Sequence, residues 1–265
     1  MRKNKKHALL TGLFLLCTLL LLSVPVQAAG KKLTNQWVTK KGNVYFYNNK
    51  GKKVTGLQKI GKYQYYFDSK GVQRSGWRKI KNNYYFFQIK SGRKAYMVKS
   101  KTINGIKLDA KGRADKKGSN LRKLKLMVEA NNIVQKITKP TMTQTEKLKK
   151  CFDYTKTAYG YTSWRAFSNK SGWELDFAED MFYKNRGDCV SYGCAFAFLA
   201  NAVGAKNVYC VSSGGHGWAE IQGKVYDPDW ALVSKVDTYF AMDYSLSGVQ
   251  GRPNYKPNRT YVVKI

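Results

Sequence analysis

The stretch NRGDCVSYGCAFAFLANAVG, residues 185–204, joins a polar, glycine-containing start to a long apolar body. Asp188 suits the N-cap position of a helix and Gly204 suits the C-cap position, so the pattern predicts a buried helix between them. Cys189 would then lie in the first helical turn. Free backbone N–H groups and the helix dipole stabilise an anion there, which favours a reactive thiolate.

A second informative stretch, SSGGHGWAEIQGKVYDPDW at 212–230, contains His216, the single histidine after residue 28. Its alternation of polar and apolar residues predicts two strands joined by a two-residue turn at Gln222-Gly223. In that register Asp227 becomes the diagonal cross-strand neighbour of His216 on the same face. A shift of one residue would move Asp227 to the opposite face, so the register of this hairpin decides the site.

Cys189, His216 and Asp227 supply what acyl transfer through a thioester needs: a nucleophile, a proton carrier and a group that orients the imidazole. The backbone N–H of Cys189 would provide one oxyanion contact, and the sequence names no second donor. We expect Cys194 and Cys210 to be buried and inert, although a disulfide between them stays open for an exported protein. With one histidine and no CxxC pair, we expect no metal site and no cofactor.

The order of these pieces resembles the transglutaminase-like superfamily, whose papain-like core places Cys on a helix and then His and Asp on successive strands. The matching pieces are GDC with its helix at 187–203, GHGWAEI at 215–221, VYDPDW at 225–230, and the upstream helices CFDYTKTAYGY at 151–161 and FAEDMF at 177–182. The resemblance covers residues 119–265 and implies that Cys189, His216 and Asp227 form a catalytic triad. It implies a thiol enzyme acting on peptide or glutaminyl amide bonds, as a peptidase or amidase or as a transamidase.

Two alternatives remain open for this part of the chain. An NlpC-type cell-wall endopeptidase also begins a helix with an Asp-Cys pair, but Ser-Gly usually follows the cysteine there, and Val190-Ser191 stands here. The other alternative is a scaffold or adhesin that keeps the fold for binding and has no activity.

The first half of the chain repeats with a period of 20 residues. The copies are QWVTKKGNVYFYNNKGKK from 36, GLQKIGKYQYYFDSKGVQ from 56, GWRKIKNNYYFFQIKSGR from 76 and a degenerate INGIKLDAKGRA from 103. Each copy predicts one β-hairpin, and because a lone hairpin is unstable in water, neighbouring copies must share their aromatic faces. Residues 33–118 resemble the cell-wall-binding and glucan-binding repeats of Gram-positive surface proteins, which include the choline-binding repeats.

This second resemblance implies attachment to a cell-wall polysaccharide or another anionic polymer of the envelope. The candidate wall-binding residues are Trp37, Tyr65, Tyr66, Trp77 and Tyr85. Leu57 stands where the family pattern has tryptophan, and many lysines surround the aromatic residues, so choline itself is disfavoured as the ligand. A spacer that binds nothing is the alternative.

The charge of the chain is unevenly distributed. The formal net charge is +32; residues 29–150 hold 32 Lys and Arg against 5 Asp and Glu, whereas residues 151–265 hold 12 against 11. Such a basic segment favours an anionic partner. Because the chain is expected to be exported, an envelope polymer is a better candidate than nucleic acid; a solvated lysine surface with no partner is the other possibility.

The N-terminus explains why we expect export. Four cations precede an apolar run from Ala8 to Val24, and the small-residue tripeptide Val26-Gln27-Ala28 follows, which predicts a signal peptide over residues 1–28. The chain would be secreted or cell-wall-associated, and it would contact a membrane only through this segment if cleavage did not occur.

These observations predict three parts: a signal peptide at 1–28, wall-binding hairpin repeats at 29–118 and a transglutaminase-like domain at 119–265. The last part should start with a helix that ends before Pro140. A capping box at Thr143 and Glu146 should start a second helix toward Ala158. The expected fold class is α+β, with helices packed on an antiparallel sheet and an all-β repeat preceding them.

Overall fold

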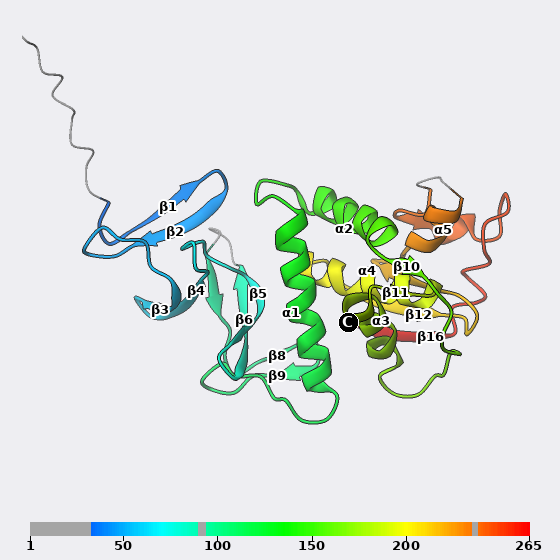
Figure 1. Ribbon diagram of the computed structural model, residues 1–265, viewed down its shortest axis with the longest axis horizontal. Helices are drawn as coiled ribbons and strands as arrows, with labels where there is room; N and C mark the ends of the chain where they lie inside the picture. The colour runs from blue at the N-terminus through cyan, green and yellow to red at the C-terminus, as the bar shows by residue number, and fades with distance from the viewer. Residues whose placement is uncertain (1–32, 90–93, 235–237) are drawn as a thin grey trace, which may run out of the picture. The chain divides into compact units, whose positions relative to one another are not determined.

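The computed structural model describes residues 33–89, 94–234 and 238–265 (Figure 1). The predicted signal peptide lies outside these residues. Residues Thr34–Ile265 pack as one compact unit. The α+β class is confirmed, and the predicted boundary at 118/119 stays a prediction. Within the described part of the chain, no helix has the length and apolar character needed to cross a membrane.

The repeats form hairpins in identical register. Their strands are β1 (Gln36–Lys40), β2 (Asn43–Tyr47), β3 (Gly56–Ile60), β4 (Tyr63–Phe67), β5 (Gly76–Ile80), β6 (Asn83–Ile89), β7 (Ala95–Met97), β8 (Thr102–Ile103) and β9 (Ile106–Lys107). In the first three hairpins Trp37 pairs with Phe46, Leu57 with Tyr66, and Trp77 with Phe86. The 20-residue period is therefore a structural period as well. β7 lies between β4 and β6 and joins two hairpins into one sheet of order β3-β4-β7-β6-β5.

The helices begin and end where local chemistry predicts. They are α1 (Asn120–Ile137), α2 (Gln144–Ala158), α3 (Trp173–Lys184), α4 (Cys189–Val203) and α5 (Pro228–Val233). Both hydrogen bonds of the predicted capping box are present at the start of α2: the Thr143 side chain accepts from the Glu146 backbone N–H, and the Glu146 side chain accepts from the Thr143 backbone N–H. Asp188 caps α4 by accepting from the backbone N–H of Ser191, and Gly204 ends that helix at φ +95°. Both predictions from the opening stretch are confirmed.

A second five-stranded antiparallel sheet supports the helices. Its order is β15 (Met242–Asp243), β14 (Lys224–Tyr226), β13 (Gly217–Ile221), β12 (Val208–Ser212) and β16 (Tyr261–Lys264), and a short 3₁₀ helix spans Tyr244–Leu246. Helix α4 is apolar on all sides, and α1, α2, α3 and the sheet all contact it. A helix of that composition is stable only when it is covered on every side, so α4 forms the centre of the core.

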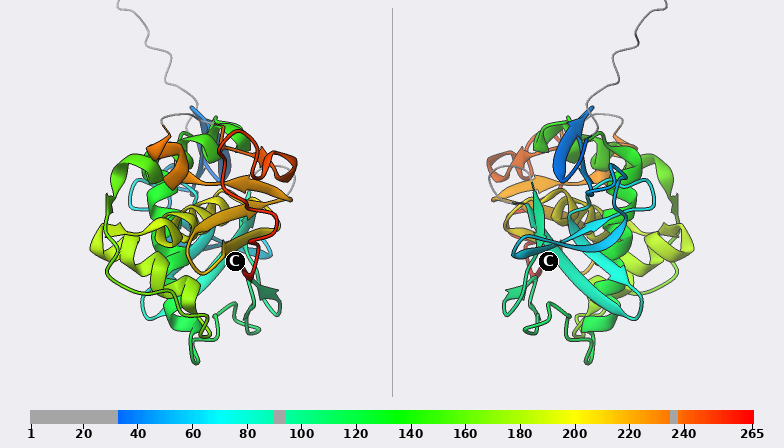
Figure 2. Two further views of the ribbon diagram at one scale, coloured as in Figure 1. Left: turned by 90° about the vertical axis from the view of Figure 1, so that its right-hand side faces the viewer. Right: turned by 90° about the vertical axis from the view of Figure 1, so that its left-hand side faces the viewer.

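The hydrophobic core continues from the repeats into the helices. Trp77 and Tyr84 of the third hairpin are buried in the same cluster as Leu124 of α1. The Trp77 indole also donates to Asn104 Oδ1 at 3.0 Å, and the Asn104 amide donates to the C-terminal Ile265 carbonyl at 3.4 Å. Figure 1 shows α1 lying between the repeat strands and the remaining helices, and Figure 2 gives the two end-on views along that direction. The last repeats thus share their apolar surface with α1.

Candidate active site

Cys189 begins α4, which packs against β13 and β12 of the second sheet. The short parallel pair β10 (Gly160–Tyr161) and β11 (Arg186–Gly187) leads the chain into the helix. The Cys189 side chain is partly exposed, and its sulfur lies 3.7 Å from the Gly215 carbonyl oxygen. The helix body is buried while its first residue stays accessible, which is the arrangement that a nucleophile at a helix N-terminus requires.

His216 and Asp227 approach each other through the predicted hairpin. Strands β13 and β14 pair with Ile221 opposite Lys224, and the turn residues Gln222 and Gly223 have φ values of +52° and +73°. The two-residue turn and its register are confirmed. As a result His216 Nε2 lies 2.5 Å from Asp227 Oδ2.

Asp227 is held from several sides. It is completely buried, and its Oδ1 accepts from the backbone N–H of Trp230 at 3.0 Å, which caps α5. Its Oδ2 accepts from the Tyr255 hydroxyl at 2.7 Å in addition to the His216 contact. A carboxylate fixed by these donors can hold the imidazole in one orientation. Tyr255 comes from a loop 28 residues downstream, and no local sequence signal marked it.

Two glycines allow the helix to lie directly on the strand. A Cβ added at Gly193 would lie 2.6 Å from the Cα of Trp218, and one added at Gly217 would lie 2.6 Å from the Cα of Val190. Both contacts are with backbone atoms, which cannot rotate away. This close approach of α4 and β13 brings the Cys189 thiol to the imidazole.

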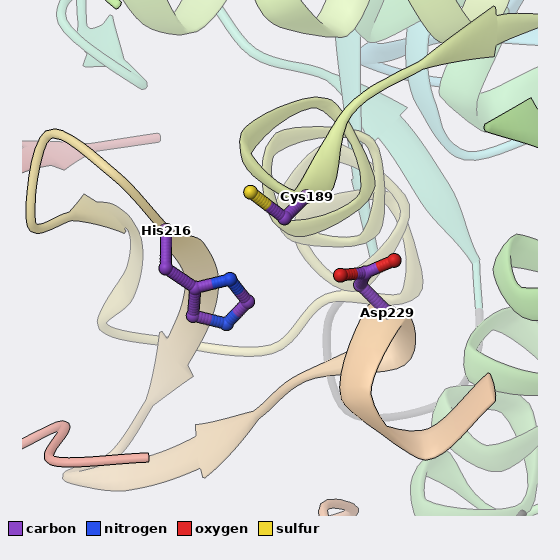
Figure 3. Close-up of side chains that lie close together, drawn as sticks. All are labelled: Cys189, His216 and Asp229. Carbon is purple, nitrogen blue, oxygen red and sulfur yellow. The ribbon is translucent and has the colours of Figure 1, made fainter. Parts of the chain in front are cut away.

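The thiol and the imidazole form a close pair. The Cys189 sulfur, a ring nitrogen of His216 and a carboxylate oxygen of Asp229 all lie within 4.8 Å of one another. Figure 3 shows one ring nitrogen of His216 facing the sulfur, and the other, Nε2, is the atom that contacts Asp227. Burial acts to lower the pKa of His216, but the charge and hydrogen bond of Asp227, together with Cys189, raise it to about 10. The imidazolium form is therefore favoured at neutral pH, which suits a thiolate partner.

The remaining cysteines lie away from this site. All four described cysteines are free thiols, so the disulfide left open for Cys194 and Cys210 is not formed. Burial raises the pKa of Cys151 to about 12, and burial with the neighbouring Cys210 raises the pKa of Cys194. The thiols of Cys151 and Cys194 are therefore held neutral and unreactive.

Tyr161 adds a polar group that sequence reasoning missed. Its side chain lies near the backbone of Cys189, and the parallel β10–β11 pair places this segment beside the start of α4. The tyrosine ring remains largely exposed and stacks on Tyr192 at 6.4 Å between ring centroids.

The comparisons with known proteins agree with this geometry. Residues 131–235 match the sequence profile of the transglutaminase-like superfamily, and residues 54–104 match that of a choline-binding repeat. The chain carries a transglutaminase-like domain. A choline-binding repeat precedes it, as the sequence predicted.

Several solved structures are similar to about a third of this chain. The choline-binding domain of a Streptococcus pneumoniae protein is 22% identical over 33% of this chain and 98% of that chain, with a TM-score of 0.28. A multimodular pneumococcal cell-wall endolysin from phage Cp-1, solved with choline, is 28% identical over 33% of this chain and 26% of that chain, with a TM-score of 0.24. Comparison with curated proteins finds no match.

The candidate aromatic residues of the choline-binding repeats lie at different depths. Trp77 and Tyr65 are buried, whereas Trp37, Tyr66 and Tyr85 keep part of their surface. Trp37 packs edge-on against Tyr65 at 4.9 Å between ring centroids. Their roles in wall binding stay predictions, and Trp37 is the most accessible tryptophan among them.

Asp229 is a third group at this site, after Tyr255 and Tyr161, that no sequence pattern indicated. It is 7% exposed, its Oδ1 has no hydrogen-bond partner, and it lies beside Cys189 and His216 (Figure 3). Cys189, His216 and Asp229 form the cluster among the described residues whose ligand atoms are close enough to hold a metal ion. Burial, followed by the charge of Asp227, raises the pKa of Asp229 to about 6.

This pKa implies a stability penalty. The folded protein keeps the Asp229 proton up to about pH 6, whereas an unfolded aspartate loses it near pH 3.8. Stability should therefore fall as the pH rises through this window, and the penalty is complete above it. We expect Asp229→Asn to raise the free energy of unfolding at pH 7.5 by about 1–3 kcal/mol, with little change at pH 4.

Thermal or urea unfolding at the two pH values measures this difference. Asp243→Asn is the control, because Asp243 is exposed and its pKa is lowered to about 2, first by Lys224. That variant should not gain stability at pH 7.5. An Asp229→Asn variant that is no more stable than the wild type at pH 7.5 would contradict the argument.

Proposed function

We propose that this protein is a cell-envelope thiol enzyme that opens peptide or glutaminyl amide bonds through a thioester on Cys189. The proposal rests on one arrangement of three residues. The Cys189 sulfur lies within 4.8 Å of a ring nitrogen of His216, and His216 Nε2 lies 2.5 Å from Asp227 Oδ2. The transglutaminase-like profile over residues 131–235 supports it.

In the proposed reaction the Cys189 thiolate attacks the substrate carbonyl carbon. The S–C bond forms, the C–N bond breaks, and the His216 imidazolium gives its proton to the departing amine. Water or an incoming amine then attacks the thioester, His216 takes its proton, and the thiolate is released. Water as the second nucleophile makes the protein a peptidase or amidase, and an amine makes it a transamidase.

The oxyanion formed in each half-reaction needs hydrogen-bond donors. The backbone N–H of Cys189 lies in the first turn of α4, and the Tyr161 side chain lies near the same backbone. We assign Tyr161 as the second donor that the sequence could not name.

The repeats would attach this enzyme to the cell wall. Support comes from the choline-binding repeat profile and from the excess of lysine and arginine in residues 29–150. The proposed partners are a cell-wall polysaccharide or anionic envelope polymer and a peptide or protein substrate. The proposed location is secreted or cell-wall-associated.

Alkylation tests the thiolate–imidazolium pair directly. We expect iodoacetamide to label Cys189 much faster than the buried Cys151, Cys194 and Cys210, and to keep doing so at mildly acidic pH. Exposure alone would also favour Cys189, so the decisive comparison is with His216→Ala. In that variant the labelling of Cys189 should slow and should fall with pH as for an ordinary thiol. Peptide mass spectrometry over a pH series measures each site.

Labelling of Cys189 that does not change in His216→Ala would show that the pair is absent, and the enzyme proposal would fall. The three buried cysteines serve as controls within the same molecule.

A further inference from the structure

A cavity of about 500 Å³ lies where the repeats meet α1, α2 and the end of α4. It is remote from Cys189, and the proposed thioester chemistry does not use it; the inference below deepens the proposed attachment to an anionic envelope polymer. Among the described residues that line it, three are cationic, namely Arg74, Arg78 and Lys147, and none is acidic.

Arg78 of β5 is the unusual member of this lining. It is 6% exposed, and its guanidinium donates to the backbone carbonyls of Ser75 at 2.6 Å and Trp77 at 3.2 Å. The amide oxygen of Gln135 also accepts from it. All of these acceptors are neutral, and Nε is buried without a partner. A buried charge without a counter-ion is costly, so this arginine lacks the anion that such a position normally has.

Neighbouring charges do not supply that anion. Arg74 is engaged with Asp68, with Nε 2.8 Å from Oδ2, so this acid is already paired. Burial, followed by the charge of Arg74, lowers the pKa of Arg78 to about 10, and the smaller opposing effects of Tyr66 and Asp68 do not offset them. Gln73 adds a second buried donor without an acceptor, since its Nε2 has no partner while its Oε1 accepts from Ala95. Two unsatisfied donors on residues that line one cavity indicate a ligand rich in acceptors.

We propose that this cavity binds the phosphate group of a polyol or sugar phosphate. Arginine recognises phosphate through several N–H donors, and Lys147 would add a second positive charge. The volume exceeds that of phosphate alone, and the amides of Asn43 and Gln135 in the lining suit hydroxyl groups on the rest of the ligand. The same chemistry is found in a free polyol phosphate and in a phosphodiester-linked envelope polymer.

Isothermal titration calorimetry of the full chain with inorganic phosphate, glycerol phosphate and poly(glycerol phosphate), at constant ionic strength, tests the proposal. We expect glycerol phosphate to bind more tightly than inorganic phosphate. Arg78→Gln should weaken its binding at least 10-fold, and Lys147→Gln should weaken it several-fold. Lys206→Gln, a cation outside the cavity, should leave binding unchanged.

The same titrations distinguish the two sources of the ligand, a free polyol phosphate and an envelope polymer. Tight binding of the monomer identifies a free polyol phosphate, whereas binding of the polymer that needs both Arg78 and Lys147 identifies an envelope polymer. Failure of all three probes to bind overturns the proposal. So does binding that Arg78→Gln and Lys147→Gln leave unchanged, because general surface charge would then explain it. If Arg78→Gln does not fold, the binding affinity of Lys147→Gln is compared with that of Lys206→Gln, and equal affinities overturn the proposal. Cys189 has no part in any of these outcomes, so they stand apart from the enzyme proposal.

Discussion

Cys189→Ala should reduce turnover by roughly 10⁴-fold or more, because no other described residue at the site offers a nucleophile for the thioester. The assay incubates cell walls with a labelled primary amine and follows both label incorporation and fragment release. Loss of incorporation in the variant identifies a transamidase. Loss of fragment release without any incorporation in the wild type identifies a peptidase or amidase, and release of cleaved stem peptides would favour the NlpC-type activity.

Cys194→Ala is the matched control, since Cys194 lies on the same helix but is buried and neutral. It should keep its activity apart from a modest loss of stability. If Cys189→Ala retained wild-type turnover, the thioester mechanism would be wrong. If neither protein showed turnover but both bound walls equally, the non-catalytic scaffold would be the better interpretation.

Asp227→Asn should lower kcat by about 10³–10⁴-fold while leaving the fold in place. The amide is close to the carboxylate in shape, and one of its atoms can still accept from Trp230. It cannot provide the negative charge that holds His216 as an imidazolium with a pKa of about 10. The pH profile of activity should therefore also change, because the imidazolium would be lost at a lower pH than in the wild type.

Tyr255→Phe tests how much the orientation of the Asp227 carboxylate contributes, apart from its negative charge. It removes one donor at 2.7 Å and leaves the charge of Asp227 intact, so its effect on kcat should be smaller than that of Asp227→Asn. Asp153→Asn, a partly exposed carboxylate on α2, should leave kcat and the pH profile unchanged. Steady-state kinetics over a pH series measures all three variants. An Asp227→Asn enzyme with wild-type kcat would remove Asp227 from the mechanism.

Several parts of the structure were predictable because they depend on residues close together in the chain. The caps at Asp188, Gly204 and Thr143 follow from side chains that bond backbone groups three residues away or from a positive φ. The turn at Gln222-Gly223 determined the β13–β14 register, and that register brought Asp227 to His216. The repeat period predicted the hairpins for the same reason.

Other features depend on contacts between distant segments, and no local pattern revealed them. No local pattern singled out Asp229, yet packing places it beside the thiol and buries it. Tyr161 and Tyr255 reach the site from 28 residues before Cys189 and 28 residues after Asp227. Their roles depend on how α4, the sheet and the downstream loop fit together.

The sequence by itself determined the helix that begins at Cys189, the hairpin that carries His216 toward Asp227, and the repeating strands before them. Each rests on backbone hydrogen bonding and side-chain periodicity within about 20 residues. Only the tertiary structure decided that the third hairpin shares a core with α1, that Asp229 stands unpaired beside the thiol, and that Arg78 is buried without an anion. Burial is a property of the whole packed chain, and it is burial that changes the chemistry of these last groups.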